Sequence, residues 1–127
     1  MEMIYKMIQL KFKEMETILF SSDNATLKYA EEDDMEGGVI STIDYEVELN
    51  DNGGDYIGGD FIFEIDEALK VFGFTNVDEL IAYCKQIIKG ETDAKQMWDK
   101  IKNDFESHDI EVSPDEYEGG DNFMTNI

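Results

Sequence analysis

Carboxylates at every second position of one segment are the residues of this chain whose type and spacing could do chemistry. Asp44, Glu46 and Glu48 alternate with apolar residues in IDYEVEL, residues 43–49. Because successive side chains of a strand point to opposite faces, this pattern predicts a strand with the three carboxylates on one face, about 6.6 Å apart, and the apolar side chains on the other. The apolar face requires a core, and the acidic face is suited to water or to a cation.

Other acidic residues flank this segment and crowd the end of the chain. Residues 21–66 hold fourteen acidic residues against Lys28, a net charge of −13, and residues 103–127 hold eight acidic residues and no lysine, a net charge of −8. Residues 1–20 and 67–102 are each neutral, so these two blocks hold the whole net charge of −21. We predict that this acidic set binds a partner: Glu31, Glu32, Asp33, Asp34, Glu36, Asp44, Glu46, Glu48, Asp109, Glu111, Asp115, Glu116 and Glu118.

A solvated face that only prevents aggregation is the alternative interpretation of these charge runs. A net charge of about 2 to 8 in magnitude is enough to keep a small domain soluble. Repulsion within so acidic a surface also destabilises the folded chain. The size and uneven distribution of the charge therefore favour a binding role.

The sequence contains no recognisable catalytic constellation. His108 is the only histidine, and no nucleophile or base accompanies it, so we expect a surface side chain. Cys84 is the only cysteine and lies on the apolar stripe of a predicted helix, where a buried thiol is inert. We predict that the protein is not an enzyme and uses no cofactor.

The glycine-rich segment that holds Asp51, Asn52, Asp55 and Asp60 offers clustered oxygen ligands of the kind that bind calcium. Counted from Asp51, the EF-hand template requires glycine at position six and glutamate at position twelve, where this chain has Tyr56 and Ile62. The stretch GGDYIGGDF is similar to a calcium-binding nonapeptide, but such motifs work as repeats. We therefore predict a plain hairpin loop and no metal.

Composition restricts the other classes of function. The 127 residues are 42% hydrophobic, which suits one domain with an ordinary core. Every cation is a lysine and the field is strongly negative, so direct binding of nucleic acid or anionic membrane is disfavoured. The lone cysteine and an N-terminus without a signal-peptide pattern predict a cytoplasmic protein.

Alternation and turn signals predict the strands. Residues 4–20 fit both a strand, near 6–13, and a helix, and we favour the strand. A turn at 21–25 precedes a short strand, and a second turn spans 33–38. Strands at 39–49 and 60–65 flank a glycine-rich loop and predict an antiparallel hairpin. Ile110 and Val112 predict a short edge strand before Pro114.

From Asp66 the hydrophobic period changes from 2 to 3.6. We predict a helix over 66–72 ending at Gly73, a second capped by Thr75 or Asn76 and running to Lys89, and a third over 93–105 with Thr92 as its cap. Strands followed by helices predict an α+β fold, with an antiparallel meander or hairpin sheet and two to three helices packed on one face. Residues 1–112 form the predicted domain, and residues 113–127 form a predicted acidic tail.

These features lead to the hypothesis that the protein occupies the basic groove of a nucleic-acid-binding protein. Its carboxylates would take the place of the phosphates that the groove binds. In size and charge, over residues 31–36, 44–48 and 104–121, the chain resembles small acidic phage anti-defence proteins, the anti-CRISPR and anti-restriction DNA mimics. The resemblance implies a non-enzymatic inhibitor whose partner is a nuclease or another nucleic-acid-binding effector. Aromatic anchors would come from Tyr45, Tyr56, Tyr117 or Phe123.

Two other functions fit the same sequence. One is an immunity protein or antitoxin that neutralises a basic nuclease toxin, because such a protein also presents acids to a basic active site. The other is a calcium-responsive binding module, which a shift of the melting temperature in millimolar calcium would reveal.

Overall fold

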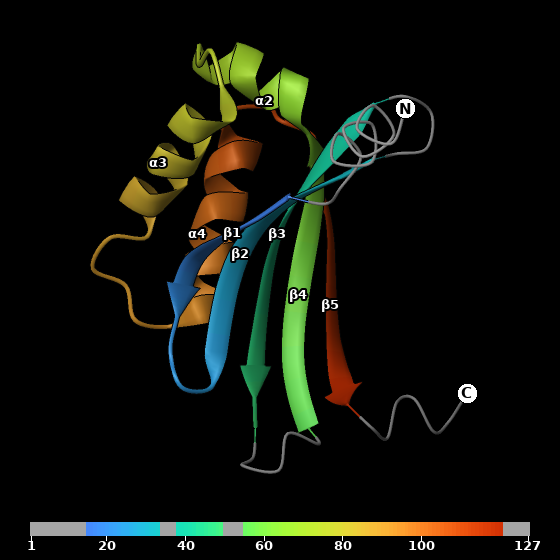
Figure 1. The fold of residues 1–127 in the computed structure, drawn as a ribbon, viewed down its shortest axis with the longest axis vertical. Helices are drawn as coiled ribbons and strands as arrows, with labels where there is room; N and C mark the ends of the chain where they lie inside the picture. Colours follow the sequence, from blue (N-terminus) through green and yellow to red (C-terminus); the bar gives the residue numbers. More distant parts are fainter. Residues whose placement is uncertain (1–14, 34–37, 50–54, 121–127) are drawn as a thin grey trace, which may run out of the picture.

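The computed structural model describes residues 15–33, 38–49 and 55–120. Five antiparallel strands form one sheet in the order of the chain: β1 (Met15–Ser21), β2 (Ala25–Asp33), β3 (Val39–Glu48), β4 (Asp55–Glu64) and β5 (Ser113–Gly120). Three helices lie between β4 and β5 in the sequence: α2 (Ile65–Phe72), α3 (Val77–Ile87) and α4 (Ala94–Ser107). The helices pack on one face of the meander (Figure 1), which confirms the predicted α+β fold.

The core lies between the sheet and α4. Tyr29, Ile43 and Phe61 occupy neighbouring positions on β2, β3 and β4 and are fully buried, because the cross-strand register puts them on the same face. From α4, the buried Trp98 donates an indole hydrogen bond to the Ile43 carbonyl at 3.1 Å, and the Phe105 ring lies 5.0 Å from that of Phe63. The helix predicted over 93–105 is confirmed as α4, and its buried side chains fix which face of the sheet it covers.

The helix ends largely follow the predicted signals. Gly73 ends α2 in the left-handed region at φ 77°, which glycine adopts without strain. Asn76 caps α3 by accepting the Glu79 N–H at 3.1 Å. The predicted cap of α4 is wrong, because Asp93 and not Thr92 accepts the Gln96 N–H, also at 3.1 Å. An Asp three residues before that N–H has the usual capping geometry.

Strand β4 begins earlier than predicted. The sequence predicts a loop over residues 55–59, but these residues pair with β3 and β5. A Cβ at Gly58 would lie 2.6 Å from the Tyr45 carbonyl oxygen and 2.8 Å from the Tyr117 ring, and a Cβ at Gly59 would lie 2.8 Å from the Tyr45 ring. These two glycines therefore permit close approach of neighbouring strands, whereas their spacing had suggested a turn.

The predicted acidic tail is wrong over residues 113–120, which form the edge strand β5. Ile62 pairs with Ser113 at one end of the ladder and Asp55 with Gly120 at the other, so the domain extends through Gly120. The predicted edge strand at Ile110 and Val112 starts at Ser113 instead. Pro114 is tolerated because it lies at the start of an edge strand.

Three predictions lie wholly or partly outside the described ranges: the strand near 6–13, the turn at 33–38, of which residues 34–37 are outside, and the end of the acidic tail at 121–127. The turn predicted at 21–25 is confirmed by a hydrogen bond of 2.8 Å from the Ser22 N–H to the Ala25 carbonyl. Among the described residues, no helix has the length and hydropathy needed to cross a membrane.

Candidate functional site: the open face of the sheet

The face of the sheet opposite the helices, called here the open face, gathers acidic side chains from all five strands. The register places Lys28, Asp44, Asp60 and Asp115 side by side across β2, β3, β4 and β5. Residues two positions along each strand share this face. The described acidic residues of the open face are Glu16, Glu32, Asp44, Glu46, Glu48, Asp60, Glu64 and Asp115.

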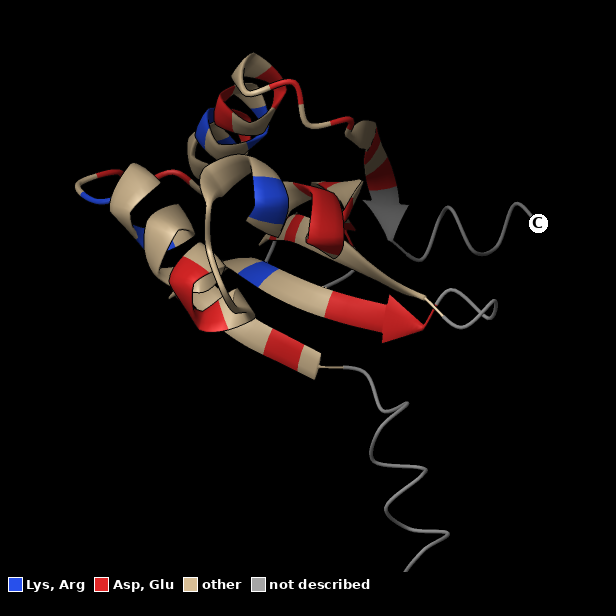
Figure 2. Cartoon of the chain, turned by 90° about the horizontal axis from the view of Figure 1, so that it is seen from above, with Lys and Arg blue, Asp and Glu red and all other residues tan. Residues whose placement is uncertain are grey.

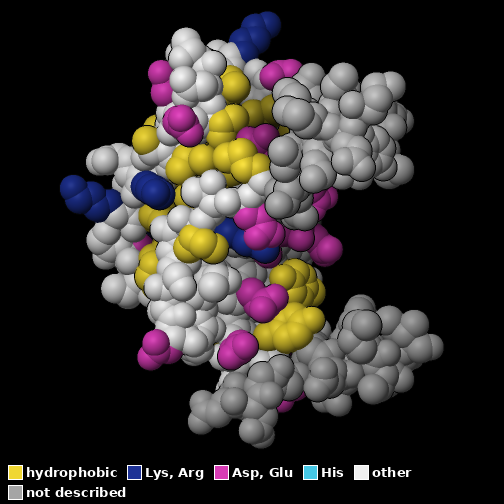
Figure 3. All heavy atoms as spheres, viewed as in Figure 1, with side chains coloured by type: hydrophobic (Ala, Val, Ile, Leu, Met, Phe, Trp, Pro, Cys, Tyr) yellow, Lys and Arg dark blue, Asp and Glu magenta, His cyan; other side chains and the backbone are white. Residues whose placement is uncertain are grey.

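The described lysines are concentrated in the helical layer. Among the residues that the structure describes, Lys28 is the only lysine on a strand, and Figure 2 shows the other lysines, in blue, on or beside the helices. The Lys28 ammonium contacts the Glu16 carboxylate at 3.0 Å across β1 and β2. Figure 3 shows acidic side chains spread over the strands with few lysines among them. Among the described residues, the open face holds eight carboxylates and one lysine, so the electrostatic potential of this face is strongly negative.

Three aspartates stand directly opposite one another in the centre of this face. Burial raises the pKa of Asp44 to about 6, against the opposing effect of Lys28, and the neighbouring Asp60 raises it further. Burial and the charge of Asp115 likewise raise the pKa of Asp60. Like charges at opposed positions of a sheet are destabilising. Ionisation of this row therefore costs the folded state free energy, which a bound cationic group would offset.

Two tyrosines lie next to the aspartate row. The rings of Tyr56 on β4 and Tyr117 on β5 are 6.0 Å apart and nearly perpendicular, at 80°. The Tyr117 hydroxyl donates a long hydrogen bond of 3.4 Å to an Asp44 carboxylate oxygen. Burial, followed by the charge of Asp44, raises the pKa of Tyr117, so it remains a neutral phenol at physiological pH.

The other predicted aromatic anchors are not on this face. Tyr45 is 2% exposed and lies on the helix side, with its ring 5.3 Å from that of Trp98, so the prediction that it anchors a partner is wrong. The physical reason is that Tyr45 alternates with the acidic residues of β3, so its side chain lies on the same face as that of the buried Ile43. Phe123 lies outside the described residues.

A shallow groove adjoins the open face at the end of β3. It has a volume of about 110 Å³ and is lined by Ser22, Asp23, Asn24, Ala25, Thr26, Glu46 and Glu48. The turn between β1 and β2 is held beside β3 because the Glu48 N–H donates to the Asn24 carbonyl at 2.8 Å. Glu46 and Glu48 therefore border both this groove and the tyrosine pair.

The predicted acidic set divides among three regions. Glu32, Asp44, Glu46, Glu48 and Asp115 lie together on the open face. The alternation of the strands turns Glu31, Asp33, Glu116 and Glu118 toward the other side. Asp109 and Glu111 lie in the connection between α4 and β5, and Asp34 and Glu36 lie outside the described residues.

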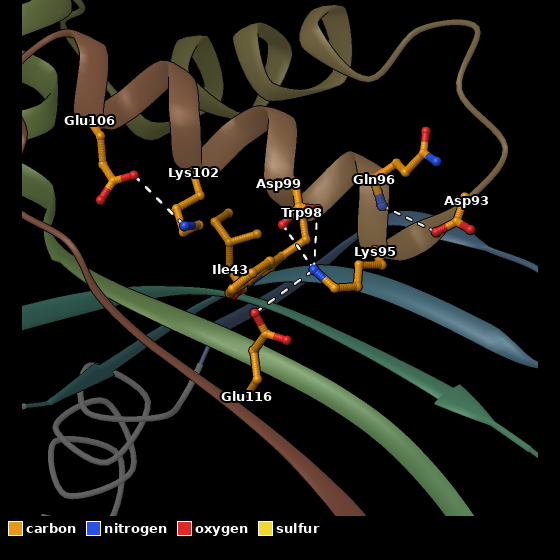
Figure 4. A network of polar contacts seen from close by, with 9 residues as sticks. All are labelled: Ile43, Asp93, Lys95, Gln96, Trp98, Asp99, Lys102, Glu106 and Glu116. Carbon is orange, nitrogen blue, oxygen red and sulfur yellow. Dashed lines mark hydrogen bonds and ion pairs between the residues drawn. The ribbon is translucent and has the colours of Figure 1, made fainter.

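Contacts within the chain engage several of the acids that are off the open face. The Glu31 carboxylate accepts a hydrogen bond of 2.8 Å from the Tyr29 hydroxyl. Glu116 contacts the Lys95 ammonium at 3.8 Å, and Lys95 also pairs with Asp99 on its own helix at 3.1 Å (Figure 4). Near Glu116, a groove of about 310 Å³ is lined by Tyr45, Ile57, Gly58, Glu116, Tyr117 and Glu118.

Register brings to the site residues that were not in the predicted set. Asp60 is the first of these, and its position next to Phe61 in an alternating segment is the sequence signal that places it on the acidic face. Glu16 and Glu64 join the face through pairing with Ala30 and Ile40, which no local pattern reveals. Within the described ranges, no group of three or more side chains has the arrangement of a metal site.

The lone histidine and cysteine lie away from this face. His108 ends α4, with Nδ1 2.8 Å from the Asp104 carbonyl oxygen, and is exposed, as predicted. Cys84 is fully buried, and burial raises the pKa of its thiol to about 12. The thiol is therefore protonated at physiological pH and poorly nucleophilic.

Comparison with protein-family models, with curated proteins and with solved structures found no match to this chain. A functional interpretation therefore depends on the geometry and charge of the open face.

Proposed function

We propose that the protein is a non-enzymatic inhibitor that binds a basic nucleic-acid-binding protein, of the anti-CRISPR or anti-restriction type, through the open face. The observation that supports this proposal is the collection of eight described carboxylates and one described lysine on the sheet face opposite the three described helices, α2, α3 and α4. A nuclease or similar effector holds lysines and arginines arranged for phosphates. The open face complements such a surface in charge.

Its geometry also suits a polyanion mimic. Carboxylates repeat at about 6.6 Å along β3, and neighbouring strands are about 4.8 Å apart, so the charges form a two-dimensional array on a rigid support. Exposed Ile18 and Ile62 share the face with these acids and supply apolar contact area. Complementary fields accelerate the encounter of such partners and make the interaction sensitive to salt. An inhibitor of this class acts in the cytoplasm, where its target meets nucleic acid.

The test begins with partner capture. Immobilised full-length protein is exposed to a bacterial lysate at low salt and eluted first with duplex DNA and then with sodium chloride. A nucleic-acid-binding protein that DNA displaces is the expected result. A partner that only salt releases would instead indicate an immunity-type inhibitor, and an empty column would leave the acidic face as a solvated surface.

Substitution then locates the interface. Asp44→Asn, Glu46→Gln and Glu48→Gln together should weaken binding of the captured partner at least tenfold, because they remove three neighbouring charges from the open face. The matched control is Glu106→Gln, Asp109→Asn and Glu111→Gln, which makes the same change in net charge at the end of α4 and in the connection that follows it. Equal weakening by both triple variants would show that only net charge matters and would refute the assignment of the open face.

A further inference from the structure

We infer that the tyrosine pair Tyr56 and Tyr117 forms a subsite for an arginine side chain of the basic partner. The inference rests on the proposed function and goes beyond it, because it assigns a specific residue type to one part of the open face. A general acidic surface would accept lysine and arginine alike.

The register shows how the subsite is built. Glu46, Gly58 and Tyr117 form one row across β3, β4 and β5, and Glu48, Tyr56 and Gly119 form the next row. The ring of Tyr117 lies across Gly58, since its Cζ and Oη atoms are 2.8 Å from the place that a Cβ of residue 58 would occupy. Glycine at this position therefore leaves room for an aromatic ring to lie along the sheet. Both tyrosines are half-buried, so part of each ring remains open to solvent.

Carboxylates of β3 and β4 lie close to the two rings. Asp44 is within 3.4 Å of the Tyr117 hydroxyl, Glu46 and Glu48 stand on the neighbouring strand β3, and Asp60 lies two residues from Gly58 on β4. The lysine of this face, Lys28, lies beyond Asp44 on β2 and pairs with Glu16 on the far side from the tyrosines. The tyrosine end of the face thus combines aromatic surface with negative charge.

This combination favours a guanidinium over an ammonium group. A guanidinium is planar, stacks on an aromatic face and donates two parallel hydrogen bonds to a carboxylate. An ammonium is a compact and strongly hydrated charge that lacks the planar fork. Charge complementarity therefore identifies the occupant as a cation, and the aromatic pair identifies it as arginine.

The experiment compares two peptides of equal charge, hexa-arginine and hexa-lysine, titrated into the full-length protein at low salt by isothermal titration calorimetry. The wild-type protein is expected to bind hexa-arginine about fivefold more tightly than hexa-lysine. Tyr117→Leu and Tyr56→Leu should each reduce this preference while leaving the affinity for hexa-lysine within about twofold. Tyr117→Phe keeps the ring and should retain most of the preference, which separates stacking from the hydroxyl hydrogen bond.

Amide chemical shifts provide a second readout that does not depend on the variants folding normally. Hexa-arginine should shift the amides of Tyr56, Gly58 and Tyr117 in the wild-type protein more than hexa-lysine does. Equal affinity for the two peptides, with shifts on the open face, would overturn the arginine subsite and leave the proposed function standing. A preference that persists in both leucine variants would also overturn it. Absence of any shift on the open face with either peptide would refute both proposals.

Discussion

Replacing Asp44 with asparagine is expected to stabilise the protein at neutral pH and to leave its stability unchanged in acid. The pKa of Asp44 rises from its ordinary value of 3.8 to about 6 in the folded protein, chiefly because of burial. The folded state therefore binds this proton more tightly than the unfolded chain does. Stability is lost as the pH rises from 3.8 to about 6, and the loss is complete above that range. Asparagine has no charge to desolvate and so avoids the loss.

The magnitude follows from the same interval. The pKa of Asp44 is 3.8 in the unfolded chain and about 6 in the folded protein, and this difference corresponds to at most about 3 kcal/mol of unfolding free energy. Because Asp44 is only half-buried, solvent screening reduces this figure, and we expect a gain of about 1–2 kcal/mol at pH 7.5. Asparagine also keeps a side-chain oxygen that can accept the Tyr117 hydroxyl hydrogen bond, so this contact does not offset the gain.

Urea unfolding of the wild-type protein and the Asp44→Asn variant at pH 7.5 and pH 3.5 measures the effect. Comparison within each pH removes the contribution of all other carboxyl groups that the two proteins share. Glu46→Gln is the matched control, because Glu46 is exposed on the same face and its replacement should change the stability by no more than about 0.5 kcal/mol. A destabilised Asp44→Asn variant at pH 7.5, or a gain of equal size at pH 3.5, would refute the reasoning.

Two further substitutions test how the sheet is assembled. Gly58→Ala should destabilise the protein by about 1–3 kcal/mol in urea unfolding, because the added Cβ would lie 2.6 Å from the Tyr45 carbonyl oxygen and 2.8 Å from the Tyr117 ring. An unchanged midpoint would show that the β4–β5 pairing is looser than described. Trp98→Phe should cost about 1–3 kcal/mol, because it removes the buried hydrogen bond to the Ile43 carbonyl and some packing. A loss below about 0.5 kcal/mol would mean that this bond does not hold α4 to the sheet.

The helices could be predicted from the sequence because their signals are local. In α4, the apolar residues Met97, Trp98, Ile101 and Phe105 recur at the spacing of one helix face, and all four are buried. Gly73 and Asn76 end and begin helices as their conformational preferences indicate. The cap of α4 was misplaced by one residue, since Thr92 and Asp93 are both good capping residues and only the backbone geometry distinguishes them.

The ends of the sheet could not be predicted, because local composition there indicated other structures. Gly58 and Gly59 look like turn residues until Tyr45 and Tyr117 are placed against them. The segment SPDEYEGG looks like a solvated tail because four of its eight residues are acidic or proline, yet it completes the sheet as β5. Pairing between β4 and β5 joins residues more than fifty positions apart, and no pattern within either strand specifies this contact.

The candidate site was predicted in part for the same reason. Alternation within β3 placed Asp44, Glu46 and Glu48 together correctly. The opposition of Asp44 to Asp60, and of Asp60 to Asp115, depends on the register of three strands and had no local signal. Glu116 belongs to the same predicted set, but it lies on the opposite side of β5, near Lys95.

The aspartate row connects the stability of the fold to its proposed function. A sheet with one solvated face requires polar side chains there, but threonine, lysine or asparagine would meet this requirement without repulsion between opposed charges. Asp44, Asp60 and Asp115 instead place three carboxyl groups side by side, and the pKa values of the first two are raised. A cationic partner would lower the pKa of Asp44 toward its ordinary value and recover part of the free energy that ionisation costs the free protein. The same Asp44→Asn change that stabilises the unbound protein should therefore weaken its complex, and a variant with both effects would link the cost to the binding.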